Sequence, residues 1–89
     1  MRLVLSGELD LAFSGRLDDA IDQHAKEGTT VTVDLTGLQF MDSSGLAAIL
    51  KAQDAAEQNG WRLAVASAPG AVDRVFELTD TRRLLHFVD

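Results

Sequence analysis

Compact apolar segments alternate with segments of helical periodicity along the whole chain, and this alternation is the strongest constraint on its fold. The apolar segments are short and rich in β-branched or aliphatic residues, which is typical of buried strands. We expect four strands, at residues 3–5, 31–35, 62–66 and 84–88. Strands separated by helix-length segments pair in parallel through right-handed crossovers, so the sequence predicts an α/β fold.

Three helices are expected between these strands. The first should begin at Ser14 and end at residues 27–28, where Gly28 suits the left-handed residue that follows a last turn. The second should run from about Ser44 to Asn59, because its alanines favour a helix and its apolar residues recur on one face. The third should begin near Pro69, whose missing amide hydrogen is harmless in a first helical turn.

The expected architecture is a small mixed, mainly parallel sheet covered by helices. A chain of 89 residues supports one modest hydrophobic core, so we expect a single domain over residues 1–89. In sheets of this kind, ligands and partners usually meet the loops at the carboxyl ends of the strands. The loops after the first two strands are therefore the first places to search for a functional site.

Composition argues against several functional classes. The formal net charge of −6 disfavours a nucleic-acid partner, because the phosphates would be repelled. The sequence has no apolar run of the length that a membrane helix needs, so we expect no membrane insertion. The chain contains no cysteine and its first residues lack the apolar length of a secretory signal, which makes the cytoplasm the expected location.

The segment Asp42-Ser43-Ser44-Gly45 is the main candidate functional site. It stands where a strand should end and the second helix should begin, so its side chains meet the first backbone amides of a helix. Asp and Ser are favoured N-cap residues, and plain helix capping is one interpretation of this segment. The other interpretation is a phosphorylatable serine, because the positive end of a helix dipole accommodates a phosphate.

Other chemistry has weaker support. A nucleophilic serine would need a nearby base, and the histidines of the chain, His24 and His86, fall on the first helix and the last strand, as ordinary structural residues. The sequence contains neither a glycine-rich phosphate loop nor a cluster of residues with metal-ligand spacing. We therefore expect a protein that is not an enzyme and that has no metal or cofactor.

A second polar segment, residues 7–10, follows the first expected strand. Parallel topology should place it beside residues 42–45, either as a simple polar turn or as the acidic rim of a docking surface. Trp61 follows Gly60 at the opposite end of the sheet, where we expect it to be partly buried in the core. Residues 80–83 are expected to form a solvated, charged turn.

Taken together, these segments resemble the STAS domain, and within it the bacterial anti-sigma factor antagonists, also called anti-anti-sigma factors. The matching segments are residues 7–12 and 33–46, with a weaker match at residues 68–78. The resemblance implies that Ser44 is phosphorylated by a serine kinase that is itself the anti-sigma factor, and that a serine phosphatase removes the phosphate. The unmodified protein would bind the anti-sigma factor and so free the sigma factor for transcription.

By the same resemblance, the residues that bind the partner would be Asp10, Asp42, Ser43, Ser44 and Gly45. STAS domains also serve as accessory subunits of membrane transporters, including lipid-transport ATPase complexes, and this is the alternative function. Family members usually begin with an extra strand and often carry a last helix, and this sequence has residues for neither. An open sheet edge invites pairing with another chain, so a homodimer through that edge is a further hypothesis.

Overall fold

The computed structural model describes residues 1–66 and 68–88. The elements follow one another in the order β1 (Arg2–Leu9), α1 (Leu11–His24), β2 (Thr30–Met41), α2 (Ser43–Asn59), β3 (Arg62–Ala66), α3 (Gly70–Leu78), a 3-10 helix (Arg82–Leu84) and β4 (Phe87–Val88). The strands form a sheet in the order β1-β2-β3-β4, and each neighbouring pair is parallel. The predicted α/β fold with a small sheet covered by helices is confirmed.

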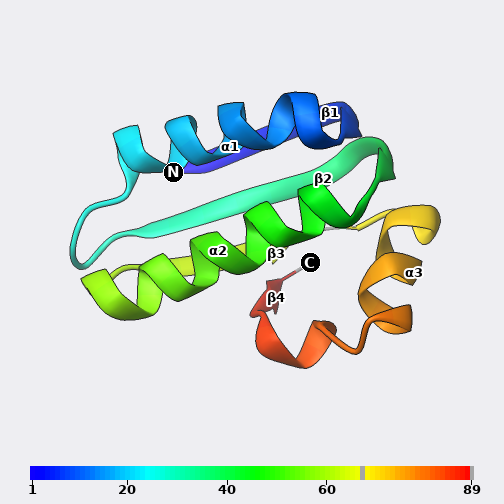
Figure 1. The fold of residues 1–89 in the computed structure, drawn as a ribbon. Helices are drawn as coiled ribbons and strands as arrows, with labels where there is room; N and C mark the ends of the chain where they lie inside the picture. The colour runs from blue at the N-terminus through cyan, green and yellow to red at the C-terminus, as the bar shows by residue number, and fades with distance from the viewer. Residues whose placement is uncertain (67, 89) are drawn as a thin grey trace.

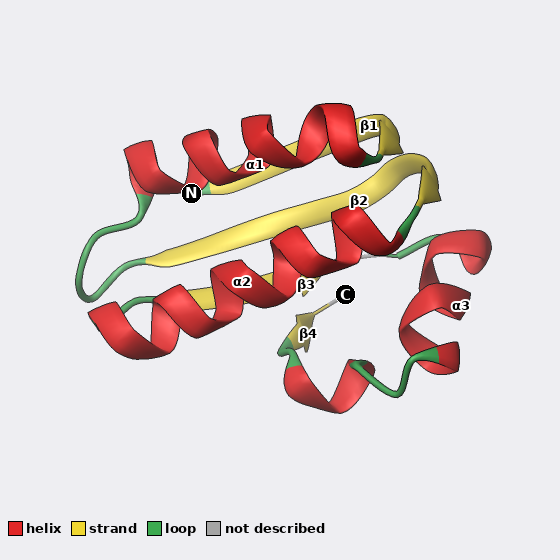
Figure 2. Cartoon of the chain, in the orientation of Figure 1, coloured by secondary structure: helices red, strands yellow, loops and turns green. Residues whose placement is uncertain are grey.

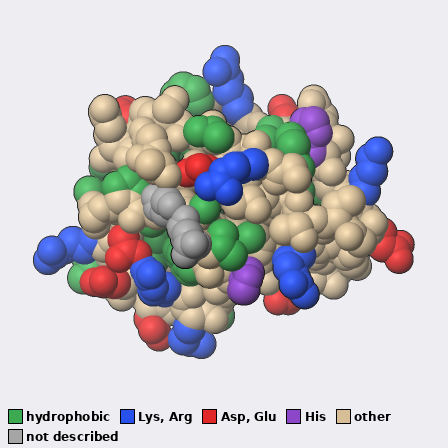
Figure 3. All heavy atoms as spheres, turned by 180° about the vertical axis from the view of Figure 1, so that it is seen from behind, with side chains coloured by type: hydrophobic (Ala, Val, Ile, Leu, Met, Phe, Trp, Pro, Cys, Tyr) green, Lys and Arg blue, Asp and Glu red, His purple; other side chains and the backbone are tan. Residues whose placement is uncertain are grey.

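Helices α1 and α2 lie side by side over one face of the sheet (Figure 1). The long strand β2 runs between β1 and β3 behind these helices, and α3 lies on the side of the sheet where α2 starts (Figure 2). Seen from behind, the molecule shows hydrophobic side chains exposed among charged ones (Figure 3). The end of the sheet where β1 and β2 finish lies next to the starts of α1 and α2 (Figure 1).

The hydrophobic core lies between the sheet and the helices. Strand β2 supplies Val31, Val33 and Leu35, each at most 1% exposed, in the two-residue alternation that sends side chains to one face. Each helix contributes apolar residues at three- or four-residue spacing. These buried helix residues are Leu17 and Ile21 of α1, Leu46, Ile49 and Ala56 of α2, and Val72 and Phe76 of α3.

Strands β1 and β2 are longer than the sequence predicts. β1 continues past Leu5 to Leu9, and β2 continues past Leu35 to Met41. Glycines at positions 7 and 37 concealed this extension, because glycine is disfavoured in strands. In the fold Gly37 is required, since a Cβ atom there would lie 2.9 Å from the carbonyl oxygen of Leu5. The main-chain pairing between the two strands therefore outweighs the local preference of their residues.

Helix α1 begins at Leu11 rather than at the predicted Ser14, and it ends at His24 rather than at residues 27–28. The start was misplaced because Asp10 was assigned to a loop, whereas its side chain caps the helix. Gly28 does have a positive φ, of 83°, but it lies in the turn that follows the helix. The hydrophobic stripe of the helix was predicted correctly, and only its ends were wrong.

The C-terminal region also differs from the prediction. A strand was expected at residues 84–88, but β4 covers only Phe87–Val88 and pairs with Val65 and Ala66 of β3. The residues before it form the 3-10 helix Arg82–Leu84, and Thr81 is buried, so residues 80–83 are not a simple solvated turn. The Phe87 ring packs edge-on against Phe76 of α3 at 5.2 Å between centroids, which ties this end to the core.

Candidate functional site

The carboxyl ends of β1 and β2 bring two polar loops together at one end of the sheet. Leu9 of β1 is paired with Met41 of β2, and the backbone amide of Asp42 donates a hydrogen bond of 3.2 Å to the carbonyl oxygen of Leu9. Residues 7–10 consequently lie beside residues 42–45, as the parallel topology predicts. The two loops lead directly into α1 and α2, so both helix starts face the same region.

Asp42 caps the start of α2. Its Oδ1 atom accepts hydrogen bonds from the backbone amides of Ser44, at 2.9 Å, and Gly45, at 3.1 Å. Its own carbonyl oxygen accepts the first helical hydrogen bond, from Leu46. The capping interpretation of this segment is therefore confirmed for Asp42, and the amides of Ser44 and Gly45 already have an anionic partner.

Asp10 makes the same arrangement at the start of α1. Its Oδ1 atom accepts from the amides of Ala12, at 3.0 Å, and Phe13, at 3.3 Å. Each of the two helices thus begins with a capping carboxylate at the same end of the sheet. Both carboxylates are fixed by two backbone hydrogen bonds, which gives this end of the molecule a defined acidic surface.

Gly45 is the point where α2 is pressed against the end of β1. The residue is buried, and a Cβ atom added there would lie 2.4 Å from the Leu9 carbonyl oxygen. The same atom would lie 2.8 Å from Cγ of Leu9 and 2.9 Å from Cγ of Met41. Any larger residue would push the helix away from the strands, so Gly45 fixes the position of the serines relative to β1.

Ser43 and Ser44 occupy the first turn of α2. Ser43 is exposed and Ser44 is partly exposed, so neither serine is sealed in the hydrophobic core. Residues 42–45 therefore combine a hydroxyl on the surface, a fixed carboxylate and a rigid helix start.

Two large apolar side chains beside these loops were missed by the sequence analysis. Phe40 is 49% exposed and stands next to Glu8 across the β1–β2 pair. Leu11 directly follows Asp10 and is 77% exposed. The available signal was a large apolar residue within two positions of each capping aspartate, where a solvent-facing loop would carry a polar one. Such exposed apolar residues with acidic neighbours are typical of a docking surface.

The acidic groups of this surface have no basic partner among residues 1–66 and 68–88. The ion pairs of that part of the chain lie elsewhere and join Arg2 to Asp34, Lys51 to Asp18, Arg82 to Asp73 and Arg83 to Asp80. Glu8, Asp10 and Asp42 therefore leave a negative potential at the helix starts, offset only by the dipoles that the aspartates cap.

The acid with the most strongly perturbed pKa lies outside this surface. Asp34 accepts hydrogen bonds from the Thr36 hydroxyl at 2.6 Å and the Thr36 amide at 2.9 Å, and from the guanidinium of Arg2 at 2.8 and 3.0 Å. These hydrogen bonds, with that of the Thr36 hydroxyl contributing most, lower the pKa of Asp34 to about 2. The cluster links the beginning of β1 to β2, and its role is to stabilise the fold.

The geometry gives no support to the alternative chemistries. His24 and His86 are exposed, and His86 lines a hollow with Trp61 and Arg62, away from the start of α2. Within the described residues, no group of three or more His, Asp or Glu side chains is arranged to hold a metal ion. Trp61 is 9% exposed and belongs to the core.

No helix within residues 1–66 and 68–88 combines the length and the apolarity needed to cross a bilayer.

Comparison with known proteins places this fold in a family. The family model described as "Mlab, STAS domain" matches residues 1–86, and the chain belongs to the STAS domain family. An anti-sigma-B factor antagonist of Staphylococcus epidermidis is 30% identical to it over 83 residues, which make up 92% of this chain and 77% of that protein. The resemblance drawn from the sequence is thereby confirmed at the level of the family.

Solved structures share the fold. A sulfate transporter family protein from Wolinella succinogenes superposes with a TM-score of 0.82 at 14% identity, covering 97% of this chain and 74% of that one. The anti-sigma factor antagonist SpoIIAA, in its unphosphorylated form, superposes with a TM-score of 0.62 at 26% identity, covering 99% of this chain and 77% of that one. The first likeness shows the fold alone, because the identity is low.

Proposed function

We propose that this protein is an anti-sigma factor antagonist that is switched off by phosphorylation of Ser44. The observation that supports it best is the start of α2, where partly exposed Ser44 follows exposed Ser43 and the capping carboxylate of Asp42. The S. epidermidis relative, named an anti-sigma-B factor antagonist, is similar over 92% of this chain. The proposed role is binding rather than catalysis, and it takes place in the cytoplasm, where sigma factors act.

In the unmodified state, the surface formed by Asp10, Asp42, Ser43, Ser44 and Gly45 binds the anti-sigma factor. The acidic caps suit a basic region of that partner, since no basic side chain within the described residues pairs with them. The neighbouring exposed apolar residues lose water contact on docking and supply the hydrophobic part of the interface.

Phosphorylation changes this surface by charge rather than by shape. A phosphoserine carries a charge of about −1.5 to −2 at neutral pH. The amides of Ser44 and Gly45 are already bonded to the Asp42 carboxylate, so they are not free to neutralise the phosphate. The added dianion stands next to an existing carboxylate, and burying it unpaired in the interface costs several kcal/mol. Each 1.4 kcal/mol weakens binding about tenfold, so the complex dissociates.

In this cycle the anti-sigma factor is itself the serine kinase, and a separate serine phosphatase restores the active form. The proposal is tested with the Ser44→Ala, Ser44→Asp and Ser43→Ala variants, a serine-kinase anti-sigma factor and ATP. Ser44→Ala should retain binding by calorimetry and take up no phosphate by mass spectrometry. Ser44→Asp should bind about tenfold or more weakly with an unchanged circular dichroism spectrum. Ser43→Ala is the matched control and should still be phosphorylated.

Two results would contradict this proposal. One is phosphate mapped to a residue other than Ser44 by the partner kinase. The other is unfolding of the Ser44→Asp variant, which would show that the charge acts on the fold rather than on the interface.

The alternative function is that of an accessory subunit of a membrane transporter, of the ABC or lipid-transport type. Its support is membership of the STAS domain family, since the likeness to a sulfate transporter family protein shows the fold alone. In that role the start of α2 would serve as a contact surface without any serine chemistry. A stable complex with a transporter ATPase, unaffected by Ser44→Asp, would favour this alternative.

A further inference from the structure

Strand β1 has main-chain groups that point away from the sheet. It is the outer strand in the order β1-β2-β3-β4, with β2 on one side and no other strand of the described residues on the other. The Met1 carbonyl oxygen accepts a hydrogen bond of 2.9 Å from Thr32 of β2. Because main-chain groups alternate in direction along a strand, those of Arg2, Val4 and Ser6 face outward.

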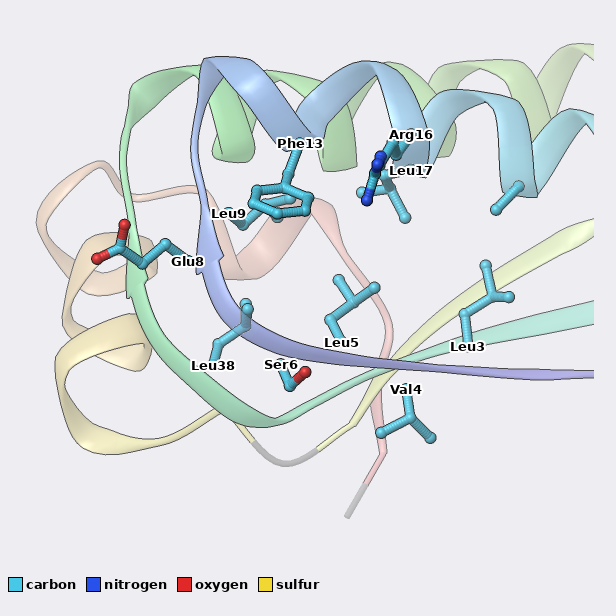
Figure 4. A pocket seen from close by; sticks show the side chains of 11 residues that line it. Leu3, Val4, Leu5, Ser6, Glu8, Leu9, Phe13, Arg16, Leu17 and Leu38 are labelled. Carbon is cyan, nitrogen blue, oxygen red and sulfur yellow. The ribbon is translucent and has the colours of Figure 1, made fainter.

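The side chains of β1 alternate as well. Arg2, Val4, Ser6 and Glu8 are exposed, and Val4 retains 68% of its accessible surface. The residues between them point toward α1 and line an apolar groove of about 310 Å³ between the strand and that helix. Figure 4 shows Leu3, Leu5 and the Phe13 ring turned into this groove, with Arg16 and Glu8 at its margin.

The charges of β1 favour an antiparallel neighbour of the same sequence. The strand carries Arg2 near its beginning, where it is paired with Asp34 of β2 but keeps 54% of its side chain exposed, and Glu8 near its end. A second β1 running antiparallel brings the arginine of each copy toward the glutamate of the other, whereas a parallel one would bring like charges together. This self-complementarity is what a symmetric interface requires, because each contact occurs twice.

We propose that two copies of this chain associate through their β1 strands, antiparallel and centred on Val4. This register sets Val4 opposite Val4 and Arg2 opposite Ser6 of the partner copy, with Glu8 of the partner diagonal to Arg2. Pairing between the two copies of β1 ends after Ser6, because Gly7 has a φ of 80° and the strand bends there. The proposal does not depend on Ser44 or on the proposed switch.

The groove completes the interface. A stable dimer buries about 1,200–2,000 Å² in total, which is more than the pairing of two short strands covers. Leu3 and Leu5 face the groove side in both copies, so pairing places the two apolar grooves next to each other. Phe13, which is 43% exposed, is then covered. The partner that fits this edge is therefore a second copy of the chain.

The first test is sedimentation of the whole chain between about 1 and 500 μM, which should show a reversible monomer–dimer equilibrium. Val4→Lys places two ammonium groups opposite each other at the symmetry axis and should shift the dissociation constant upward by about tenfold or more. Leu78→Lys is the matched control, because Leu78 is 76% exposed on α3 and should leave the equilibrium unchanged.

The second test uses the absence of cysteine from the chain. Opposed residues of a hydrogen-bonded antiparallel pair have Cα atoms about 5.5 Å apart, within the range that a disulfide spans. Val4→Cys should therefore form a disulfide-linked dimer rapidly under mild oxidation. Ser6→Cys is the control from the same strand, because its copies stand four residues apart along the pair, about 14 Å, and should cross-link slowly.

A monomer at all concentrations would overturn the proposal, as would a dimer that Val4→Lys leaves unchanged. Equal cross-linking rates for Val4→Cys and Ser6→Cys would overturn it too. The cross-linking arm also keeps the proposal testable if Val4→Lys fails to fold.

Discussion

Replacing Gly45 by alanine tests whether the start of α2 is held against β1 as the structure indicates. The added Cβ atom would lie 2.4 Å from the Leu9 carbonyl oxygen, and a backbone atom cannot rotate out of its way. Inserting a methyl group into a packed site costs about 1–3 kcal/mol. Alanine would regain about 1 kcal/mol of intrinsic helix propensity. Because the contact is with backbone, we expect the steric cost to lie at the top of its range, about 3 kcal/mol, with a net loss of about 2 kcal/mol.

Gly15 provides a matched control within α1. A Cβ atom added there meets nothing within 4 Å, so Gly15→Ala keeps only the gain in helix propensity. We expect that variant to be more stable by about 0.5–1 kcal/mol. The two glycines thus predict opposite signs for the same chemical change in two helices of one protein.

The assay is urea unfolding at low protein concentration, followed by the fluorescence of Trp61, which is the single tryptophan and is buried. In a domain of this size, 2 kcal/mol corresponds to a decrease of about 10 °C in the melting temperature. A Gly45→Ala variant as stable as Gly15→Ala would refute the packing of α2 on the end of β1. It would also remove the structural reason for glycine in the Asp-Ser-Ser-Gly segment.

Two further changes probe groups that the structure singles out. Asp42→Ala removes the acceptor of the Ser44 and Gly45 amides and should lower the free energy of unfolding by about 0.5–2 kcal/mol, whereas Asp42→Ser should retain most of the stability in the same urea titration. The pKa of Asp34 is lowered from 3.8 to about 2 in the folded protein, so its ionised form favours the fold. That stabilisation is complete above about pH 4 and is lost as the pH falls toward about 2. Acid titration of the unfolding free energy should show this loss, and Asp34→Asn should flatten the curve in that window; an unchanged slope would show that Thr36 and Arg2 do not hold the carboxylate.

Much of the secondary structure was predictable because it depends on local features. Strand β3 was predicted with the observed bounds, Arg62–Ala66, since a compact apolar segment between polar turns leaves few alternatives. Helix α2 was predicted to within one residue, because its alanines and the Asp42 cap act within the segment itself. The candidate functional segment, residues 42–45, was found for the same reason.

The ends of β1 and β2 were not predictable in this way. Gly7 and Gly37 lie inside strands because each strand supplies hydrogen-bond partners to the other, and that pairing joins residues about thirty positions apart. The assignment of Asp10 to a loop had the same cause, since the true end of β1 sets the true start of α1. In both cases, pairing with a strand that is distant in sequence outweighed the local preference of the residues.

The sequence by itself determined the α/β class, the apolar faces of the helices and the identity of the Asp-Ser-Ser-Gly segment. Only the tertiary structure decided that Gly45 packs directly against the Leu9 carbonyl. It also decided that β1 is the outer strand, with one edge that no other strand of the described residues covers. The physical reason is that propensity and periodicity act between near neighbours in sequence, whereas close contacts and free hydrogen-bonding groups depend on which distant segments the fold brings together.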